Sequence, residues 1–178
     1  MVRPHLKRPA MEDLRPDRDA RQSARSERWR DTLEHVVRLA RLPAEVFALV
    51  TNPSRWHEWH PNTRDVDAAA DHSLGVGEEV IERIRVGPFR GAVTWKVTAA
   101  EPGRRWVLYG DAGNGFQSEL EYTLQAEGEG TLFRRRVRLR WPWWFVLGGF
   151  ATRTMAKDAS AALDNLQRVL ARQEKAGS

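Results

Sequence analysis

The last stretch of the chain carries the pattern that most restricts the fold. From Trp141 to about Gln173, steps of ~100° per residue separate apolar and small side chains from charged ones, as on an amphipathic helix. Pro142 suits the first turn of this predicted helix. One side holds Ala151, Thr152, Met155, Ala159, Ala162, Leu163, Leu166, Val169 and Leu170, and the other holds Arg153, Lys157, Ser160, Asp164, Gln167, Arg168 and Arg172. A single helix of this kind must bury its apolar side against another element.

The residues before this helix alternate between apolar and polar in short runs, and turn residues separate the runs. We expect strands at residues 31–41, 63–70, 79–86, 90–100, 105–110, 116–125 and 131–141, a short helix at 43–51 and a further helical turn at 54–60. Connections as short as Gly87-Pro88 require antiparallel neighbours, because a parallel pair needs a long crossover. The sequence therefore predicts a seven-stranded antiparallel sheet that packs against the long helix.

Charge is distributed unevenly along the 178 residues. We expect one domain at residues 31–175, preceded by a tail at residues 1–30 that is disordered or loosely docked, because it has three prolines and no apolar period. The tail holds nine basic and five acidic residues, and so carries four of the five net positive charges. The basic character is thus no indication that the folded part binds nucleic acid.

Several classes of protein are excluded by what the sequence lacks. Cysteine is absent, which removes disulfides, thiolate nucleophiles and cysteine zinc sites. His57 and His60 are three residues apart, whereas the zinc-protease pattern needs four, so we expect no metal and no cofactor. No apolar run approaches ~18 residues and no secretory signal is recognisable, which predicts a cytoplasmic protein. Nothing in the sequence indicates an oligomeric state.

Several short segments together resemble a known family. They are Leu42–Val50 with Asn52-Pro53, Trp56–Pro61, Gly75–Gly77, Val93–Thr98, Glu101–Arg104 and Gly130-Thr131. In this order they resemble the START/SRPBCC superfamily, and within it the polyketide cyclase/dehydrase and lipid-transport branch of bacterial proteins. The resemblance covers residues 31–173. It implies an α+β helix-grip fold, in which a curved seven-stranded antiparallel sheet wraps around a long C-terminal helix, with two short helices between strands 1 and 2 and a hydrophobic cavity inside.

Alternation along the strands predicts which side chains face that cavity. The predicted ligand-binding residues are His35, Glu82, Val93, Trp95, Phe116, Leu120, Tyr122, Phe133, Arg135, Val137, Trp144, Met155, Ala159 and Leu163. His35, Glu82 and Arg135 stand out, because they are ionisable residues on otherwise apolar faces. They are either polar anchors for a ligand or, in the alternative, a structural ion pair and a satisfied core histidine. For the strand at 105–110 either Trp106 and Leu108 or Val107 and Tyr109 point inward.

His35, Tyr122 and Arg135 are also the candidate catalytic residues. A ring-closing site needs an acid/base group beside a donor that binds a carbonyl, and these residues are of the right chemical types. Their spacing in the sequence does not show whether they meet.

Two other features have more than one interpretation. The outward residues Arg134, Arg136, Arg138 and Arg140 could follow a phosphate backbone, but Glu34, Glu119 and Glu121 on the expected neighbouring strands predict cross-strand pairing instead. We therefore expect no nucleic-acid partner. The segment Trp141–Phe150 has more large apolar side chains than one helix stripe can bury. It is a plug between helix and sheet, a gate at the cavity mouth, or a patch for transient contact with a membrane or a partner.

Three functions follow from this reading. The first is binding or transport of a small hydrophobic molecule, such as a lipid, a quinone or a polyketide-like compound, in the internal cavity. The alternative is a polyketide aromatase/cyclase or dehydratase that uses the same cavity. The third is a protein-interaction module of the chaperone-activator kind, which a well-filled core would favour.

Overall fold

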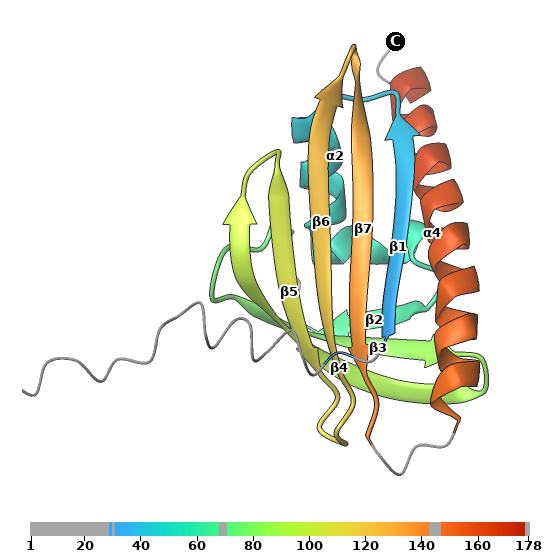
Figure 1. The fold of residues 1–178 in the computed structure, drawn as a ribbon. Coiled ribbons are helices and arrows are strands. Elements are labelled where there is room, and N and C mark those ends of the chain that lie inside the picture. The colour runs from blue at the N-terminus through green and yellow to red at the C-terminus, as the bar shows by residue number, and fades with distance from the viewer. Residues whose placement is uncertain (1–28, 30, 68–70, 143–146, 177–178) are drawn as a thin grey trace, which may run out of the picture.

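The computed structural model describes residue 29 and residues 31–67, 71–142 and 147–176. Within these residues, seven strands form one antiparallel sheet in the order β1-β7-β6-β5-β4-β3-β2 (Figure 1). The strands are β1 (Asp31–Leu39), β2 (Thr63–Asp67), β3 (Glu79–Val86), β4 (Phe89–Glu101), β5 (Arg105–Asp111), β6 (Gln117–Glu127) and β7 (Gly130–Arg140). The sheet curls into a half-barrel, and the long helix α4 (Gly148–Ala176) runs beside β1. The predicted α+β helix-grip fold is confirmed.

Two short helices connect β1 to β2, as predicted. They are α2 (Pro43–Val50), which lies behind the sheet in Figure 1, and α3 (Trp56–Trp59). A 3-10 turn (Pro53–Arg55) precedes α3, so the predicted helical turn at 54–60 is divided in two. Asn52 is the cause of the division, because its side-chain oxygen accepts the Ser54 N–H at 3.0 Å and caps the 3-10 turn.

The long helix begins later than the sequence analysis predicts. Helix α4 starts at Gly148, and Pro142 lies outside it in an irregular segment that follows β7. Pro142 instead packs on the turn between β5 and β6, where a Cβ on Gly115 would lie 3.2 Å from the Pro142 Cβ. The expectation that Pro142 opens the helix is therefore wrong, because a tertiary contact holds it against the sheet. Residues 143–146, which the aromatic segment includes, lie outside the described part of the chain.

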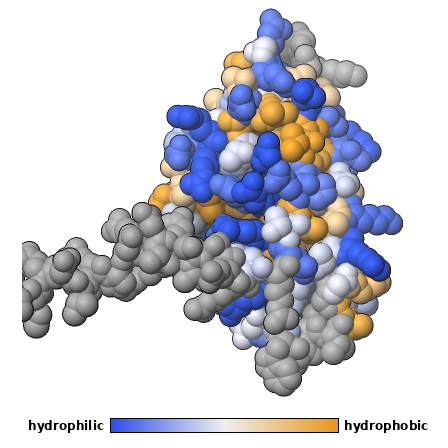
Figure 2. Space-filling model, in the orientation of Figure 1, coloured by the Kyte–Doolittle hydropathy of each residue, from blue (hydrophilic) through white to orange (hydrophobic). Residues whose placement is uncertain are grey.

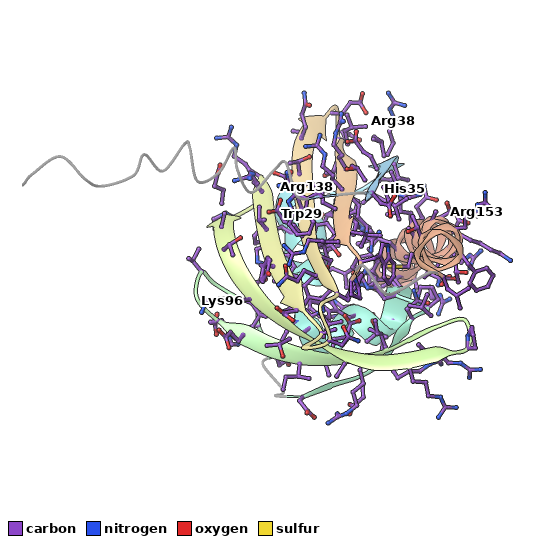
Figure 3. All side chains as sticks on the ribbon, turned by 60° about the horizontal axis from the view of Figure 1, so that its bottom comes forward. Trp29, His35, Arg38, Lys96, Arg138 and Arg153 are labelled. Atoms are coloured by element: carbon purple, nitrogen blue, oxygen red, sulfur yellow. The ribbon has the colours of Figure 1, made fainter. Side chains whose placement is uncertain are left out.

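Helix α4 buries the stripe that the periodicity predicts. Ala151, Ala159, Ala162, Leu163, Leu166, Val169 and Leu170 are all buried, and Thr152 and Met155 are partly buried. The Asn165 amide donates to the Trp59 carbonyl at 3.3 Å, which ties the middle of the helix to α3. Arg153, on the opposite side, points away from the sheet in the end-on view of Figure 3. Side chains from both elements fill much of the space between sheet and helix.

The inner face of the sheet forms an aromatic core. Trp59, Trp106, Tyr122 and Phe133 are almost wholly buried, and the Trp106 and Tyr122 rings stack with centroids 5.7 Å apart. Trp106 and Leu108 point inward on β5, which decides between the two alternatives for this strand. Val107 is nevertheless buried as well, with an exposed fraction of 5 %.

The outer face carries the predicted charge pairs. Arg134 and Arg136 both bind Glu34, and Arg138 binds Glu119. Hydrophilic residues cover much of the middle of this face in Figure 2. The expected tail at residues 1–30 lies outside the described residues except for Trp29, whose ring centre is 5.6 Å from the Arg138 guanidinium. Among the described residues, no helix is long and apolar enough to cross a membrane.

Candidate functional site

An apolar cavity of about 170 Å³ lies at the end of the molecule where α4 begins. The β3–β4 hairpin, the end of β5, the turn before β6 and the first turns of α4 form its walls. The predicted ligand residues Val93, Phe116 and Met155 line it, together with residues that were not predicted to bind a ligand: Ile84, Val86, Arg90, Gly91, Ala92, Ala112, Asn114, Trp141, Pro142 and Ala151.

A second, smaller space of about 30 Å³ is lined by polar and charged groups as well as apolar ones. Its walls include Arg135 from β7 and His60 from the end of α3, and the predicted residues Val137 and Ala159. Met155 lines both spaces. The apolar chamber and the polar one therefore both lie against this flexible side chain.

The three candidate catalytic residues are neighbours across the sheet. In the antiparallel register, His35 of β1 lies opposite Arg135 of β7, and Arg135 lies opposite Tyr122 of β6. All three point to the inner face, as the alternation along their strands predicts. Their role in a ligand site or in catalysis stays a prediction.

Arg135 is the central group of this row. Its Nε is buried and has no hydrogen-bond partner. The Tyr122 hydroxyl is hydrogen-bonded to its guanidinium, but burial is the stronger influence and raises the pKa of Tyr122 to about 12. Tyr122 is therefore an uncharged hydroxyl at neutral pH, able to donate a hydrogen bond beside the partly buried Arg135 guanidinium.

His60 completes the cluster, and the sequence analysis considered it only as a metal ligand. Its Nε2 lies 3.4 Å from the Tyr122 hydroxyl. Burial lowers the pKa of His60 well below 6.5, and the charge of Arg135 lowers it further, so the imidazole is neutral at neutral pH. The available signal was its position four residues after Trp56, which places both rings on one side of the chain. The two rings do stack, with centroids 6.3 Å apart.

Glu82 is buried and fully hydrogen-bonded. Its carboxylate accepts the Thr63 hydroxyl and, at 2.8 Å, the Trp95 Nε1–H. Burial raises the pKa of Glu82, although both hydrogen bonds and the charge of Arg135 act in the opposite direction. Glu82 lines neither chamber, and it holds the inward-facing Trp95 ring in place.

His35 lies between β1 and α4 (Figure 3). Burial lowers its pKa, as does Arg135, while a hydrogen bond to the Ala156 backbone opposes them. Its Nδ1 is buried without a partner. The row thus contains two buried polar atoms, His35 Nδ1 and Arg135 Nε, that the chain leaves unsatisfied. Such atoms are rare in folded proteins and call for an explanation.

The remaining predicted ligand residues lie elsewhere. Leu120, Phe133 and Leu163 belong to the packed core and line neither chamber, and Trp144 lies outside the described residues. The residues described here contain no group of three His, Asp or Glu side chains able to hold a metal ion.

Comparisons with known proteins agree with this architecture. Residues 30–171 match a family model described as polyketide cyclase/dehydrase and lipid transport. Among solved structures, a START superfamily protein from Mycobacterium smegmatis aligns with a TM-score of 0.66 and 12% identity, over 80% of this chain and 98% of that one. Protein CV1439 from Chromobacterium violaceum aligns with a TM-score of 0.64 and 14% identity, over 79% and 98%. A search of curated proteins finds no significant match.

Proposed function

Because the chain belongs to the polyketide cyclase/dehydrase and lipid-transport family, which has a hydrophobic ligand-binding fold, we propose that it binds a small, mainly apolar molecule with one polar or anionic group. The apolar body occupies the larger chamber, and the polar group reaches Arg135, Tyr122 and His60. The link between the apolar body and the polar group rests on one observation, namely that Met155 lines both chambers.

The size of the larger chamber restricts the ligand. A dry apolar cavity of about 150 Å³ in another protein admits benzene, and the chamber here, which is half open, has a volume of about 170 Å³. A single ring or a short alkyl chain is therefore the expected body. Met155 has three rotatable bonds, and its movement would join the chambers for a longer molecule.

The polar chamber favours an anionic or strongly hydrogen-bonding oxygen. Arg135 is a partly buried cation whose buried Nε lacks an acceptor, and no carboxylate is hydrogen-bonded to it among the described residues, although Asp158 also lines this space. Tyr122 supplies a second donor. Charge-assisted hydrogen bonds of this kind are roughly twice as strong as neutral ones, so a carboxylate should bind more tightly than an alcohol of equal chain length.

Octanoate and octan-1-ol form a matched pair of probes for this proposal. In isothermal titration of the full chain, we expect octanoate to bind about tenfold more tightly than octanol. In Arg135→Gln the preference for octanoate over octanol should fall to about twofold, while the affinity for octanol stays the same. Arg135→Lys should keep part of the preference for octanoate. Arg172→Gln, an exposed substitution at the far end of α4, is the control for net charge.

The two parts of the proposal fail in different ways. If the wild-type protein binds neither probe, nor any larger ring or chain, the function itself is wrong. If it binds both equally, or if Arg135→Gln keeps the preference for octanoate, only the assignment of the polar end is wrong. Thermal unfolding of each variant shows whether a loss of binding reflects a loss of folding.

A second candidate is a cyclase or dehydratase reaction in the same chambers. The observation that favours it is the 3.4 Å approach of the His60 Nε2 to the Tyr122 hydroxyl, which puts a neutral base beside a donor for a carbonyl oxygen. His35 and Arg135 lie in the same row. If turnover of a polyketide-like substrate were found and His35→Ala, His60→Ala and Arg135→Ala all left it unchanged, this assignment of residues would be wrong. The chamber of about 170 Å³ argues against the third interpretation, a protein-interaction module with a filled core.

A further inference from the structure

The positive charges around the start of α4 differ from those on the outer face of the sheet. On that face Arg83, Arg134, Arg136 and Arg138 all have carboxylate partners. The cations at the α4 end have none among the described residues: the Arg85 side chain donates to the Gly87 carbonyl, and no ion pair is formed by Arg90, Arg153 or Lys157.

Two of these cations oppose each other directly. Arg85 of β3 and Arg90 of β4 are paired residues in the antiparallel register of the hairpin, and both are exposed. Like charges in such a pair destabilise a hairpin. An external anion would relieve this repulsion.

Apolar side chains are exposed beside the same charges. Leu147 is 51 % and Phe150 is 55 % exposed, and apolar surface is visible at the lower right of Figure 2, where α4 begins. Phe150, Arg153 and Lys157 follow one another at helical spacing on the side of α4 that faces away from the sheet. The β3–β4 hairpin contacts the flank of α4 next to this side, because a Cβ on Gly87 would lie 3.9 Å from the Thr154 Cγ2.

We propose that these six residues, Arg85, Arg90, Leu147, Phe150, Arg153 and Lys157, form a docking surface for a membrane that contains anionic lipids. Exposed apolar side chains next to unpaired cations are the combination that binds the interface of such a membrane. Residues 143–146 are not part of the surface as defined. The surface also adjoins the larger chamber, whose wall includes Arg90 and Ala151, so docking would bring that chamber to the lipid.

Vesicle flotation with the full chain tests the docking surface. The probes are vesicles of phosphatidylcholine alone and vesicles in which part of the phosphatidylcholine is replaced by phosphatidylglycerol. Near a membrane each cation contributes about a fivefold gain in affinity for anionic lipid. Arg153→Gln with Lys157→Gln should therefore weaken binding to phosphatidylglycerol vesicles roughly ten- to thirtyfold, and Phe150→Ser should weaken it as well.

The same helix offers a matched control. Arg168→Gln with Arg172→Gln removes two exposed charges at the same spacing, about 22 Å further along α4, and should change vesicle binding by no more than about twofold. Because residues 1–30 are identical in all variants, their basic charge cannot produce a difference between the two pairs. Octanol affinity should stay the same in both, which separates this test from that of the ligand site.

Three outcomes would overturn the proposal. They are equal binding of the wild-type chain to both kinds of vesicle, equal losses from the two pairs of substitutions, and unchanged vesicle binding in Arg153→Gln with Lys157→Gln. If that last variant instead lost retention on a heparin column while vesicle binding stayed intact, the surface would recognise a soluble polyanion.

Discussion

Single glycines decide how closely the side chains of the inner face can pack. Gly110 of β5 faces Trp95, and a Cβ at this position would lie 2.6 Å from the Trp95 Cζ3 and 2.9 Å from the Val93 Cγ1. The same indole donates to Glu82 at 2.8 Å. The missing side chain of Gly110 therefore allows the tryptophan to reach the buried carboxylate.

Gly110→Ala should destabilise the protein by about 1–3 kcal/mol, because the new methyl group must displace a ring that its hydrogen bond holds in place. Gly91→Ala is the matched control on the adjacent strand, since a Cβ there meets nothing within 4 Å. It should be neutral or stabilise by up to about 1 kcal/mol, as alanine is less costly than glycine in a strand. Urea unfolding at neutral pH measures both, and equal midpoints for the two variants would contradict this account.

At the scale of elements, helix α4 combines two different kinds of packing. Toward its C-terminus Leu166, Val169 and Leu170 are buried in the continuous core. In its first turns the inward residues are Ala151, Met155 and Ala159, and both chambers lie against them. Small side chains at the helix start thus keep open the space that large ones fill further along.

Filling this space should abolish ligand binding without unfolding the protein. Ala151→Leu adds three carbons to a buried position on the chamber wall, so octanol affinity should fall at least about tenfold while stability changes by less than roughly 1.5 kcal/mol. Ala171→Leu, at an exposed position on the opposite side of the helix, should leave affinity unchanged. Calorimetric titration and thermal unfolding give the two quantities. An unaltered affinity in Ala151→Leu would mean that octanol binds elsewhere.

For the molecule as a whole, the partly buried residues His35 and His60 should make stability depend on pH. Burial lowers the pKa of both His35 and His60 below 6.5 in the folded state. As the pH falls, these histidines are therefore protonated more readily in the unfolded chain than in the folded one, and stability is lost below about pH 6.5. Glu82 acts in the opposite sense: burial raises its pKa, so its contribution decreases as the pH rises through the folded-state value.

His60→Gln isolates the histidine contribution. The wild-type protein should lose more stability than this variant between about pH 7.5 and pH 5.5, so the difference between their urea midpoints should shrink on acidification. His57→Gln, which replaces an exposed histidine of the same short helix, is the matched control. Parallel profiles for His60→Gln and the wild type would show that His60 does not titrate differently in the folded state.

Much of the fold could be predicted from the sequence because it depends on local periodicity. The alternation of apolar and polar residues predicted seven strands to within a few residues of their observed ends. It also predicted that Glu82 and Arg135 lie on the inner face of the sheet, and Glu82 is buried there. The helical stripe at residues 151–170 was predicted from side-chain spacing alone. These features need only near neighbours in the chain, and the sequence contains that information directly.

Tertiary structure decided what the site contains. The register between strands aligned His35, Arg135 and Tyr122 in one row and brought His60 to it from a helix more than sixty residues before Tyr122 in the chain. Packing of Pro142 on the β5–β6 turn delayed the start of α4. The chambers exist because small side chains from separate elements face one another, and empty space is a property of three-dimensional packing that no single stretch of sequence specifies.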